Sequence, residues 1–211
     1  IFVFTHDSIF LGEDGPTHQP VEQHWALRLI PGVTYFRPAD GLETAMAWAY
    51  ALRETKAPTC LGLSRQGLPA IVREESFSPE TIWRGGYVVQ EAESPKVILV
   101  GTGSELHLCC DAARLLAEQG LAVRVISMPS VDLFLRQDEA YRQRILPWSH
   151  PAIVSVEAGV TGPWSQITGP YGLRIGLDRF GASAPASVLA EKFGFTAEAI
   201  SEQVQVHLQG Q

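Results

Sequence analysis

The hydrophobic positions of the first part of the chain fall into short runs that are separated by polar loops. The apolar run IFVFT at residues 1–5 predicts a buried strand, and the loop that follows it, from residue 6 to residue 20, is rich in Gly, Asp and Pro. Pro20 suits the first position of a helix, and Asp40 suits the cap of another, with Glu43 completing a capping box. The expected elements are a strand over 1–5, a helix over 20–29, a strand over 33–36, a helix from 40 to 54 and a strand over 59–63.

Beyond residue 86, apolar runs of strand length alternate with amphipathic stretches of helix length. This alternation predicts an α/β domain with a mostly parallel sheet in three layers. The expected strands lie over 87–89, 97–101, 122–127 and 152–156. The expected helices lie after Gly103 and over 138–145, 186–193 and 196–208, and a turn or helix follows Pro163.

Two domains are expected from these elements. The first segment has too few elements to close a sheet of its own, so it predicts half of a second α/β domain that precedes the complete one. Residues 73–86, with Pro79 and two consecutive glycines, are typical of a connection between domains. We therefore expect domains over residues 1–78 and 79–211, and an unpaired sheet edge and exposed apolar face on the half-domain if it stands alone.

Composition and charge narrow the classes of function. The chain has 211 residues, 45% hydrophobic and 18% charged, as in an ordinary globular protein. Its 16 basic and 23 acidic residues give a net charge of −7, and without a Lys or Arg run this argues against a nucleic-acid partner. No apolar stretch approaches the roughly 18 residues of a membrane helix, so we expect a soluble cytoplasmic chain without a membrane partner.

The cysteines and the start of the chain add two expectations. Cys60, Cys109 and Cys110 show no metal-ligand spacing, and we expect buried, reduced thiols. The chain opens in a strand without an initiator Met, which predicts further sequence upstream of Ile1.

The densest group of polar residues is the loop THDSIFLGEDGPTHQP at residues 5–20, which begins where a predicted strand ends. Open α/β sheets place ligands at such ends. Imidazoles can donate to sugar hydroxyls or to a developing oxyanion, and a carboxylate accepts from a hydroxyl, so the loop predicts a polyol or carbonyl substrate. Two alternatives stay open. The loop can be a surface turn capped by its own Asp and His residues, or a metal site of His6, Asp14, His18 or His24, although no HExxH or CxxC spacing supports the metal.

A second motif, GTGSE at residues 101–105, follows a predicted strand and opens a predicted helix. It is similar to a nucleotide-binding fingerprint, but Leu106 occupies the place of the third glycine and no Walker-type GK[ST] is present. We interpret the motif as a strand-to-helix turn with Ser104 as the helix cap, at which an anion can still bind.

The loop sequence, extended to THDSIFLGEDGPTHQPVE, resembles the signature of the transketolase family, and further matches follow in family order almost to the C-terminus. Phe10 departs from the pattern, which usually has Gly at that position. The other matching segments are RPAD (37–40), ET (43–44), LSRQ (63–66), GGYV (85–88), GTGSE (101–105), VISMPS (125–130), YR (141–142), VEAG (156–159) and the closing DRFGASAPASVL and FGFT.

The resemblance implies a homodimer of three-domain subunits, with thiamine diphosphate held between the pyrophosphate-binding domain of one subunit and the pyrimidine-binding domain of the other. Residues 1–78 resemble the second half of the pyrimidine-binding domain, and residues 79–211 resemble the C-terminal domain. The implied reaction transfers a two-carbon ketol unit from a ketose phosphate to an aldose phosphate in the pentose phosphate pathway.

The resemblance also implies site residues. His18 matches the catalytic histidine beside the thiazolium of the cofactor, His6 and Asp14 match residues that bind the hydroxyls of the substrate, and Arg65 matches the phosphate-binding arginine. The family's motif for diphosphate and Mg²⁺ or Ca²⁺, and its activating glutamate, have no counterpart here, since Glu43 caps a helix. We therefore expect the isolated chain to be inactive without its missing N-terminal portion.

Other functions stay open beside this one. Deoxyxylulose phosphate synthase shares a DGPTH-like loop, but LGEDGPTHQP, RPAD and LSRQ together are more similar to transketolase. Dihydroxyacetone synthase is nearer, and formaldehyde as acceptor would distinguish it. From a different class, the chain can be a non-catalytic dimerisation or interaction module.

Overall fold

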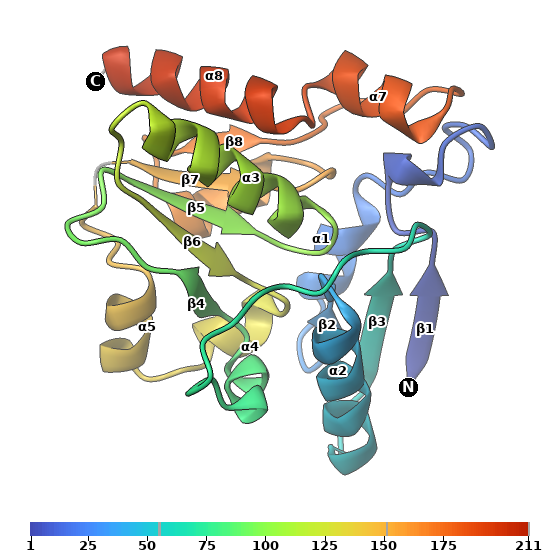
Figure 1. The fold of residues 1–211 in the computed structure, drawn as a ribbon. Helices are drawn as coiled ribbons and strands as arrows, with labels where there is room; N and C mark the ends of the chain where they lie inside the picture. The colour runs from blue at the N-terminus through green and yellow to red at the C-terminus, as the bar shows by residue number, and fades with distance from the viewer. Residues whose placement is uncertain (55, 151, 211) are drawn as a thin grey trace.

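The computed structural model describes residues 1–54, 56–150 and 152–210 and contains two sheets (Figure 1). The first segment, residues 1–63, forms a parallel sheet in the order β1-β3-β2. Its elements are β1 (Phe2–Thr5), the 3-10 helix η1 (Ile9–Leu11), α1 (Gln23–Arg28), β2 (Thr34–Phe36), α2 (Gly41–Arg53) and β3 (Thr59–Leu63).

The C-terminal segment, residues 87–210, forms a larger sheet in the order β4-β6-β5-β7-β8, in which β4 is antiparallel and the other strands are parallel. The mostly parallel α/β fold predicted from the sequence is thus confirmed. Its strands are β4 (Tyr87–Gln90), β5 (Val97–Gly101), β6 (Val123–Ser127), β7 (Ile153–Val156) and β8 (Leu173–Ile175). Its helices are α3 (Glu105–Glu118), α4 (Val131–Leu135), α5 (Glu139–Ile145), η3 (Gly162–Trp164), α6 (Ser165–Thr168), α7 (Ala186–Phe193) and α8 (Ala197–Gln209).

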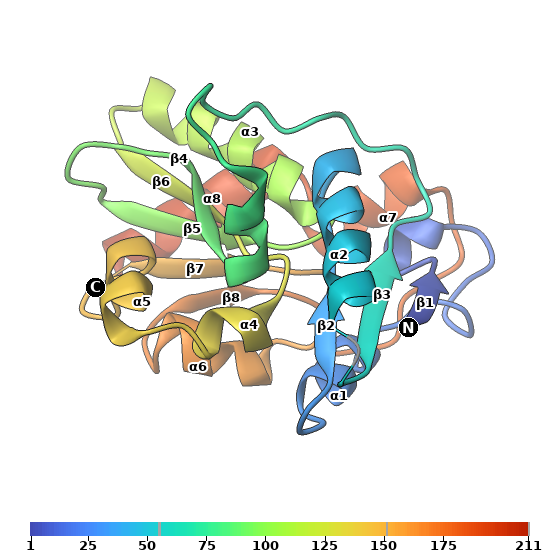
Figure 2. The same cartoon turned by 90° about the horizontal axis from the view of Figure 1, so that it is seen from below.

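Helices cover both faces of the larger sheet, because alternate residues of its strands point to opposite sides. Val97 and Leu99 pack with α3 and α8, whereas Ile98 and Val100 pack with the side of α4, α5 and α6. Figure 2 shows α4, α5 and α6 together on the second face, and α3 and α8 behind the sheet. The result is the predicted three-layer arrangement.

The connection between β3 and β4 crosses from one sheet to the other and contains the 3-10 helix η2 (Pro79–Arg84), which packs on α2. The indole of Trp83 donates to the carbonyl of Met46 at 2.8 Å. The expected boundary at residues 78 and 79 falls at the start of η2, and it stays a prediction.

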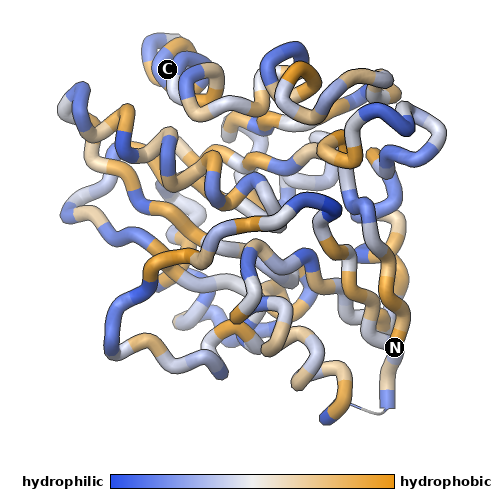
Figure 3. Tube along the Cα trace, turned by 45° about the vertical axis from the view of Figure 1, so that its right-hand side comes forward, coloured by the Kyte–Doolittle hydropathy of each residue, from blue (hydrophilic) through white to orange (hydrophobic). Residues whose placement is uncertain are grey.

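Several sequence-based expectations were wrong in detail. β1 was expected to be buried, but all four of its residues are exposed because it is the edge strand of the smaller sheet. Figure 3 shows this hydrophobic strand at the edge of the molecule. α1 begins at Gln23 rather than Pro20. Two short elements, α4 and β8, were not predicted at all.

The predicted helix caps had mixed outcomes. Asp40 caps α2 as expected, with its Oδ1 accepting from the backbone N–H of Glu43 at 2.9 Å. The Glu43 carboxylate accepts from the N–H of Ala39 at 2.7 Å, which is one residue earlier than in a standard capping box. Ser104 makes no side-chain cap, because its hydroxyl donates to the Glu105 carboxylate instead.

The cysteines and the lengths of the helices can also be compared with the sequence. Cys60 and Cys109 are buried as expected, whereas Cys110 is only half-buried, and all three are free thiols. Within the described residues, no helix is long and apolar enough to cross a membrane.

Candidate functional site

The candidate site lies where the parallel strands of the smaller sheet end. Thr5 of β1 pairs with Leu63 of β3, so His6 and Arg65 both follow paired strand ends at the same edge. Arg37 follows β2 at this edge as well. The carboxyl ends of parallel strands are the usual position for ligand-binding residues in open α/β sheets.

His6 has an unusual backbone conformation. Its φ of 62° lies in the left-handed region, where residues other than glycine are uncommon. The side chain is half-buried, and its Nδ1 is hydrogen-bonded to the Thr5 hydroxyl at 2.8 Å. No described residue is hydrogen-bonded to the other imidazole nitrogen.

Asp14 and His18 lie further along the same loop, and both are exposed. The loop is closed by backbone hydrogen bonds, from the N–H of Gly15 to the carbonyl of Gly12 at 3.2 Å and from that of His18 to Gly15 at 3.0 Å. Gln19 is buried beneath it and donates to the Gly12 carbonyl at 2.9 Å. With the loop closed in this way, the Asp14 carboxylate and the His18 ring lie at the surface.

Arg65 is exposed, and no described residue forms an ion pair or hydrogen bond with its guanidinium. Its neighbours Ser64 and Gln66 line a cavity of about 250 Å³ beside the start of α2. Three of the four predicted site residues, His6, Asp14 and His18, thus lie on one loop. Arg65 lies at the sheet edge where that loop begins. Among the described residues, however, no two of the four are in direct polar contact.

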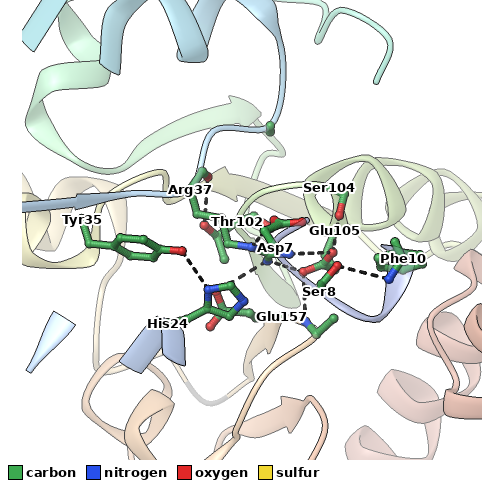
Figure 4. Close-up of polar contacts among 12 residues, drawn as sticks. Asp7, Ser8, Phe10, His24, Tyr35, Arg37, Thr102, Ser104, Glu105 and Glu157 are labelled. Atoms are coloured by element: carbon green, nitrogen blue, oxygen red, sulfur yellow. Dashed lines mark hydrogen bonds and ion pairs between the residues drawn. The ribbon is translucent and has the colours of Figure 1, made fainter. Parts of the chain in front are cut away.

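Behind this edge, a buried ion-pair cluster joins the two segments (Figure 4). The Arg37 Nε donates to Asp7 Oδ2 at 2.8 Å. The two terminal nitrogens of Arg37 donate to the two oxygens of Glu105, and one also donates to the carbonyl of Thr102 at 3.1 Å. Gly103 makes room for the guanidinium, since a Cβ at that position would lie 2.7 Å from its central carbon.

Glu157, directly after β7, extends this cluster to α1. The Arg28 guanidinium donates to both Glu157 oxygens, at 2.7 and 2.8 Å. The Trp164 indole donates to the same carboxylate at 2.8 Å, and Arg28 lies over the rings of Trp25 and Trp164. We refer to Asp7, Arg28, Arg37, Glu105 and Glu157 as the Arg37 cluster.

Burial and neighbouring charges set the ionisation of the Arg37 cluster. Burial by itself would lower the pKa of Arg37, but the three carboxylates raise it well above its ordinary value. Burial would likewise raise the pKa of Glu157, but Arg28 lowers it to about 2. Burial raises the pKa of Glu105 in spite of Arg37. Both Glu105 oxygens nevertheless accept hydrogen bonds, from Arg37, from the Ser104 hydroxyl and from the N–H of Ala158.

His24 of α1 lies beside the cluster and is 2% exposed. Its Nδ1 is hydrogen-bonded to the Tyr35 hydroxyl at 2.8 Å. Burial is the main cause that lowers the pKa of His24 to about 4, so its ring is neutral at pH 7. His24, Tyr35 and Gly62 line a cavity of about 350 Å³ on the smaller sheet, and Gly62 is required there because a Cβ would clash with the Tyr35 hydroxyl.

The metal alternative for the loop finds no support. The described residues contain no group of three or more His, Cys, Asp or Glu that could hold a metal ion. His24, one of the four candidate ligands, is instead buried against Tyr35.

The Arg37 cluster was missed as a unit by sequence reasoning, although RPAD, GTGSE and VEAG were noticed as matching segments. A signal was present: Asp7, Arg37 and Glu157 each follow a predicted strand within two residues, and Glu105 closes the turn after another. Periodicity could not show that the strand ends of the two sheets face each other.

Comparisons with known proteins assign both segments of the chain to one family. Residues 1–70 match the family model of the transketolase pyrimidine binding domain, and residues 85–196 match that of the transketolase-like TK C-terminal domain. The plasmid transketolase of Cupriavidus necator is 50% identical over 209 residues, covering 99% of this chain and 31% of that protein. Transketolase 1 of Escherichia coli is 47% identical over 199 residues, covering 94% of this chain and 30% of that protein.

Solved structures give the same result. The transketolase of Leishmania mexicana has a TM-score of 0.90 at 42% identity, covering 98% of this chain and 30% of that one. A split gene transketolase, described as an inactive beta4 tetramer, has a TM-score of 0.75 at 25% identity, covering 98% of this chain and 66% of that one. The chain thus spans less than a third of the length of the curated relatives named above. With both of its segments matched, the chain belongs to the transketolase family.

Proposed function

We propose that the chain is the C-terminal portion of a transketolase, which transfers a two-carbon ketol unit from a ketose phosphate to an aldose phosphate in the pentose phosphate pathway. The observation that carries this proposal is the position of His6 and Arg65 at one sheet edge, with Asp14 and His18 on the loop that starts there. The whole-length relatives with which it shares 47% to 50% identity are named transketolase.

Arg65 binds the phosphate of the sugar in this proposal. A guanidinium presents a fixed fork of donors that matches phosphate oxygens, and Arg65 is exposed with no competing described partner. His6, directly after the paired end of β1, and Asp14 on the loop bind hydroxyls of the substrate.

His18 acts at the reacting carbonyl. Negative charge develops on the carbonyl oxygen of a ketose when a nucleophile adds to it, and an imidazole N–H placed at that oxygen stabilises the charge. Donors of this kind contribute about 3 kcal/mol where they have been measured. The Nδ1 of His18 is hydrogen-bonded to Thr17 at 2.9 Å, which leaves Nε2 for this contact.

The cofactor and the partners belong to the same proposal. The transketolase family uses thiamine diphosphate, and residues 1–78 form half of the domain that holds its pyrimidine. In this proposal the main residues that bind the cofactor and its Mg²⁺ or Ca²⁺ are supplied from outside this chain, because the family's diphosphate motif has no counterpart in its sequence. A missing N-terminal portion and a second subunit complete the site. The intact enzyme acts in the cytoplasm, and the isolated chain is inactive.

A non-catalytic assembly module is the second candidate. It is favoured by one observation, the likeness to a split gene transketolase described as an inactive beta4 tetramer. The exposed Arg65 after β3, with His6 after β1 and the exposed His18 on the same loop, argues for the catalytic role, since an assembly module needs no sugar-phosphate site.

The phosphate role of Arg65 provides the test. In enzyme reconstituted from this chain and the upstream portion, Arg65→Ala is expected to raise the KM for a phosphorylated ketose about tenfold to a hundredfold, because charge-assisted hydrogen bonds are lost. The KM for an unphosphorylated donor should change little. Arg53→Ala is the matched control. Arg53 is also exposed, but it belongs to α2 and lies over the ring of Trp83 in η2. Equal losses on the two donors would contradict the assignment.

A further inference from the structure

The conformation of His6 needs support from its surroundings. A φ of 62° is unfavourable for a histidine and persists only where neighbouring contacts hold the backbone. On one side, Thr5 is held in the ladder between β1 and β3. On the other side, Asp7 is 3% exposed and begins the buried part of the loop.

Arg37 is the residue that holds Asp7. Its Nε donates to Asp7 Oδ2 at 2.8 Å, and the other oxygen of Asp7 is buried with no partner among the described residues. This ion pair is therefore the one polar contact of the Asp7 side chain within the described part of the chain. Without it, a carboxylate would stay buried and unpaired, and the loop would have to move to reach water.

The C-terminal segment in turn fixes Arg37. Glu105, at the start of α3, accepts from both terminal nitrogens, and the Arg37 carbonyl accepts from the N–H of Gly103 at 3.0 Å. The backbone N–H of Arg37 donates to the carbonyl of Pro129 at 2.8 Å. Both the main chain and the side chain of Arg37 are thus held by the larger sheet.

The far end of the substrate loop is held by the same segment. Gln19 donates to the carbonyl of Ala182 at 3.0 Å, and the Ser183 hydroxyl donates to the carbonyl of Glu13. Phe10, the residue that departs from the family pattern, packs edge to face on Phe195 with ring centroids 6.2 Å apart. The loop is therefore shaped against the C-terminal segment along its length.

We propose that Arg37 is a positioning residue, which fixes the left-handed backbone of His6 through Asp7 and so couples the direction of the His6 imidazole to the C-terminal segment. The consequence for sugar-phosphate binding rests on the proposed function. The consequence for the His6 backbone does not, because it is a property of the folded chain.

Variants of Asp7 separate positioning from simple stabilisation. Asp7→Ala removes the acceptor of Arg37 Nε, whereas Asp7→Asn removes the charge but keeps an oxygen that can accept the same bond. The matched control is Glu43→Gln, because Glu43 is a fully buried carboxylate outside the Arg37 cluster, bonded to Tyr87 and Ser127 instead of Arg37. The measurement is the set of backbone ¹³C chemical shifts of His6 in the 211-residue chain, which report on its φ.

The expected result is that the His6 shifts leave their left-handed values in Asp7→Ala, keep them in Asp7→Asn, and keep them in Glu43→Gln. Unchanged shifts in Asp7→Ala would overturn the proposal, as would equal changes in both Asp7 variants or in the control. If Asp7→Ala does not fold, Arg37→Lys serves instead, since a lysine keeps the charge but cannot reach Asp7 and Glu105 with one planar fork. Retained His6 shifts in folded Arg37→Lys would then overturn it.

Kinetics of the reconstituted enzyme extend the test. Asp7→Ala should raise the KM for the ketose phosphate about tenfold with a smaller change in kcat, and Asp7→Asn should restore the KM, as expected of a lost ground-state contact. A change in kcat alone would contradict the positioning of a substrate-binding histidine. A reconstituted wild type without activity would refute the proposed function instead, while the His6 shifts would still decide the positioning.

Discussion

The two sheets differ in how they are stabilised. Every residue of β5 and β7 in the larger sheet is buried, whereas every residue of β1 in the smaller sheet is exposed. Two valines show the contrast: Val154 is fully buried, and Val3 is 43% exposed. Burial of apolar side chains on both faces stabilises the larger sheet. The smaller sheet gains less from such burial, because the described elements leave its edge strand β1 exposed.

The smaller sheet is instead tied to the larger one through charged groups. Its own buried apolar clusters are small. Arg28 pairs with Glu157 directly after β7, and Arg37 pairs with Glu105 at the start of α3. The Arg37 cluster disfavours other arrangements of the two sheets, because separating one of its partners would leave a buried charge unpaired. The difference teaches that the sheet edge on which the candidate site lies is bonded to the C-terminal segment through buried ion pairs.

The largest effect on the free energy of unfolding should follow from removing the central cation of the Arg37 cluster. Arg37→Met keeps the apolar part of the side chain but leaves Asp7 and Glu105 without their cation, which should lower the free energy of unfolding by about 3–5 kcal/mol. Urea unfolding monitored by circular dichroism measures it. Arg114→Met is the control, since Arg114 pairs with Glu118 on an exposed helix face, where about 0.5 kcal/mol is expected. Similar losses of unfolding free energy in both variants would contradict the structural role of the Arg37 cluster.

The next effect depends on pH. The pKa of His24 is about 4 in the folded chain and about 6.5 when unfolded, so between these values the unfolded state binds more protons. The free energy of unfolding should therefore fall by up to about 1.4 kcal/mol per pH unit below pH 6.5, or about 3 kcal/mol in total by pH 4. Glu157, with a pKa of about 2, should add its loss only below about pH 4.5.

Urea unfolding at pH 7 and pH 5 measures the His24 contribution. The His24→Gln variant should lose most of the difference between the two pH values, because its side chain does not titrate. The same difference in the variant and the wild type would show that another group causes it.

A smaller effect compares the apolar cores of the two sheets directly. Val154→Ala should lower the free energy of unfolding by about 2 kcal/mol, because it leaves a cavity in the larger sheet. Val3→Ala should lower it by about 0.5 kcal/mol or less, because that side chain is already partly hydrated. Both values come from urea unfolding of the isolated chain, and equal losses would refute the contrast between the sheets.

The elements found from the sequence were those with strong local signals. The range of β3 was predicted correctly, as were those of β5 and α7, and Asp40 caps α2 as expected. α4 and β8 were missed because five-residue and three-residue elements have too little periodicity to detect. The burial of β1 was wrong because an apolar run does not show whether other strands cover it.

The candidate site was predictable to a similar degree. The loop of His6, Asp14 and His18 was proposed from its composition and its position after a strand, and Arg65 from the family resemblance; the roles of these residues stay predictions. The Arg37 cluster was not, because its contacts join residues between 30 and 129 positions apart. Such pairs depend on how the two sheets face each other, and local patterns carry no information on that.

Ketol transfer from xylulose 5-phosphate to ribose 5-phosphate is the measurement that tests the central claim most directly. The purified chain, with thiamine diphosphate and Mg²⁺ supplied, should be silent by itself and active once the upstream portion is added. Activity of the chain alone would contradict the account of a divided site. Silence in both cases would contradict the catalytic role and favour the assembly module.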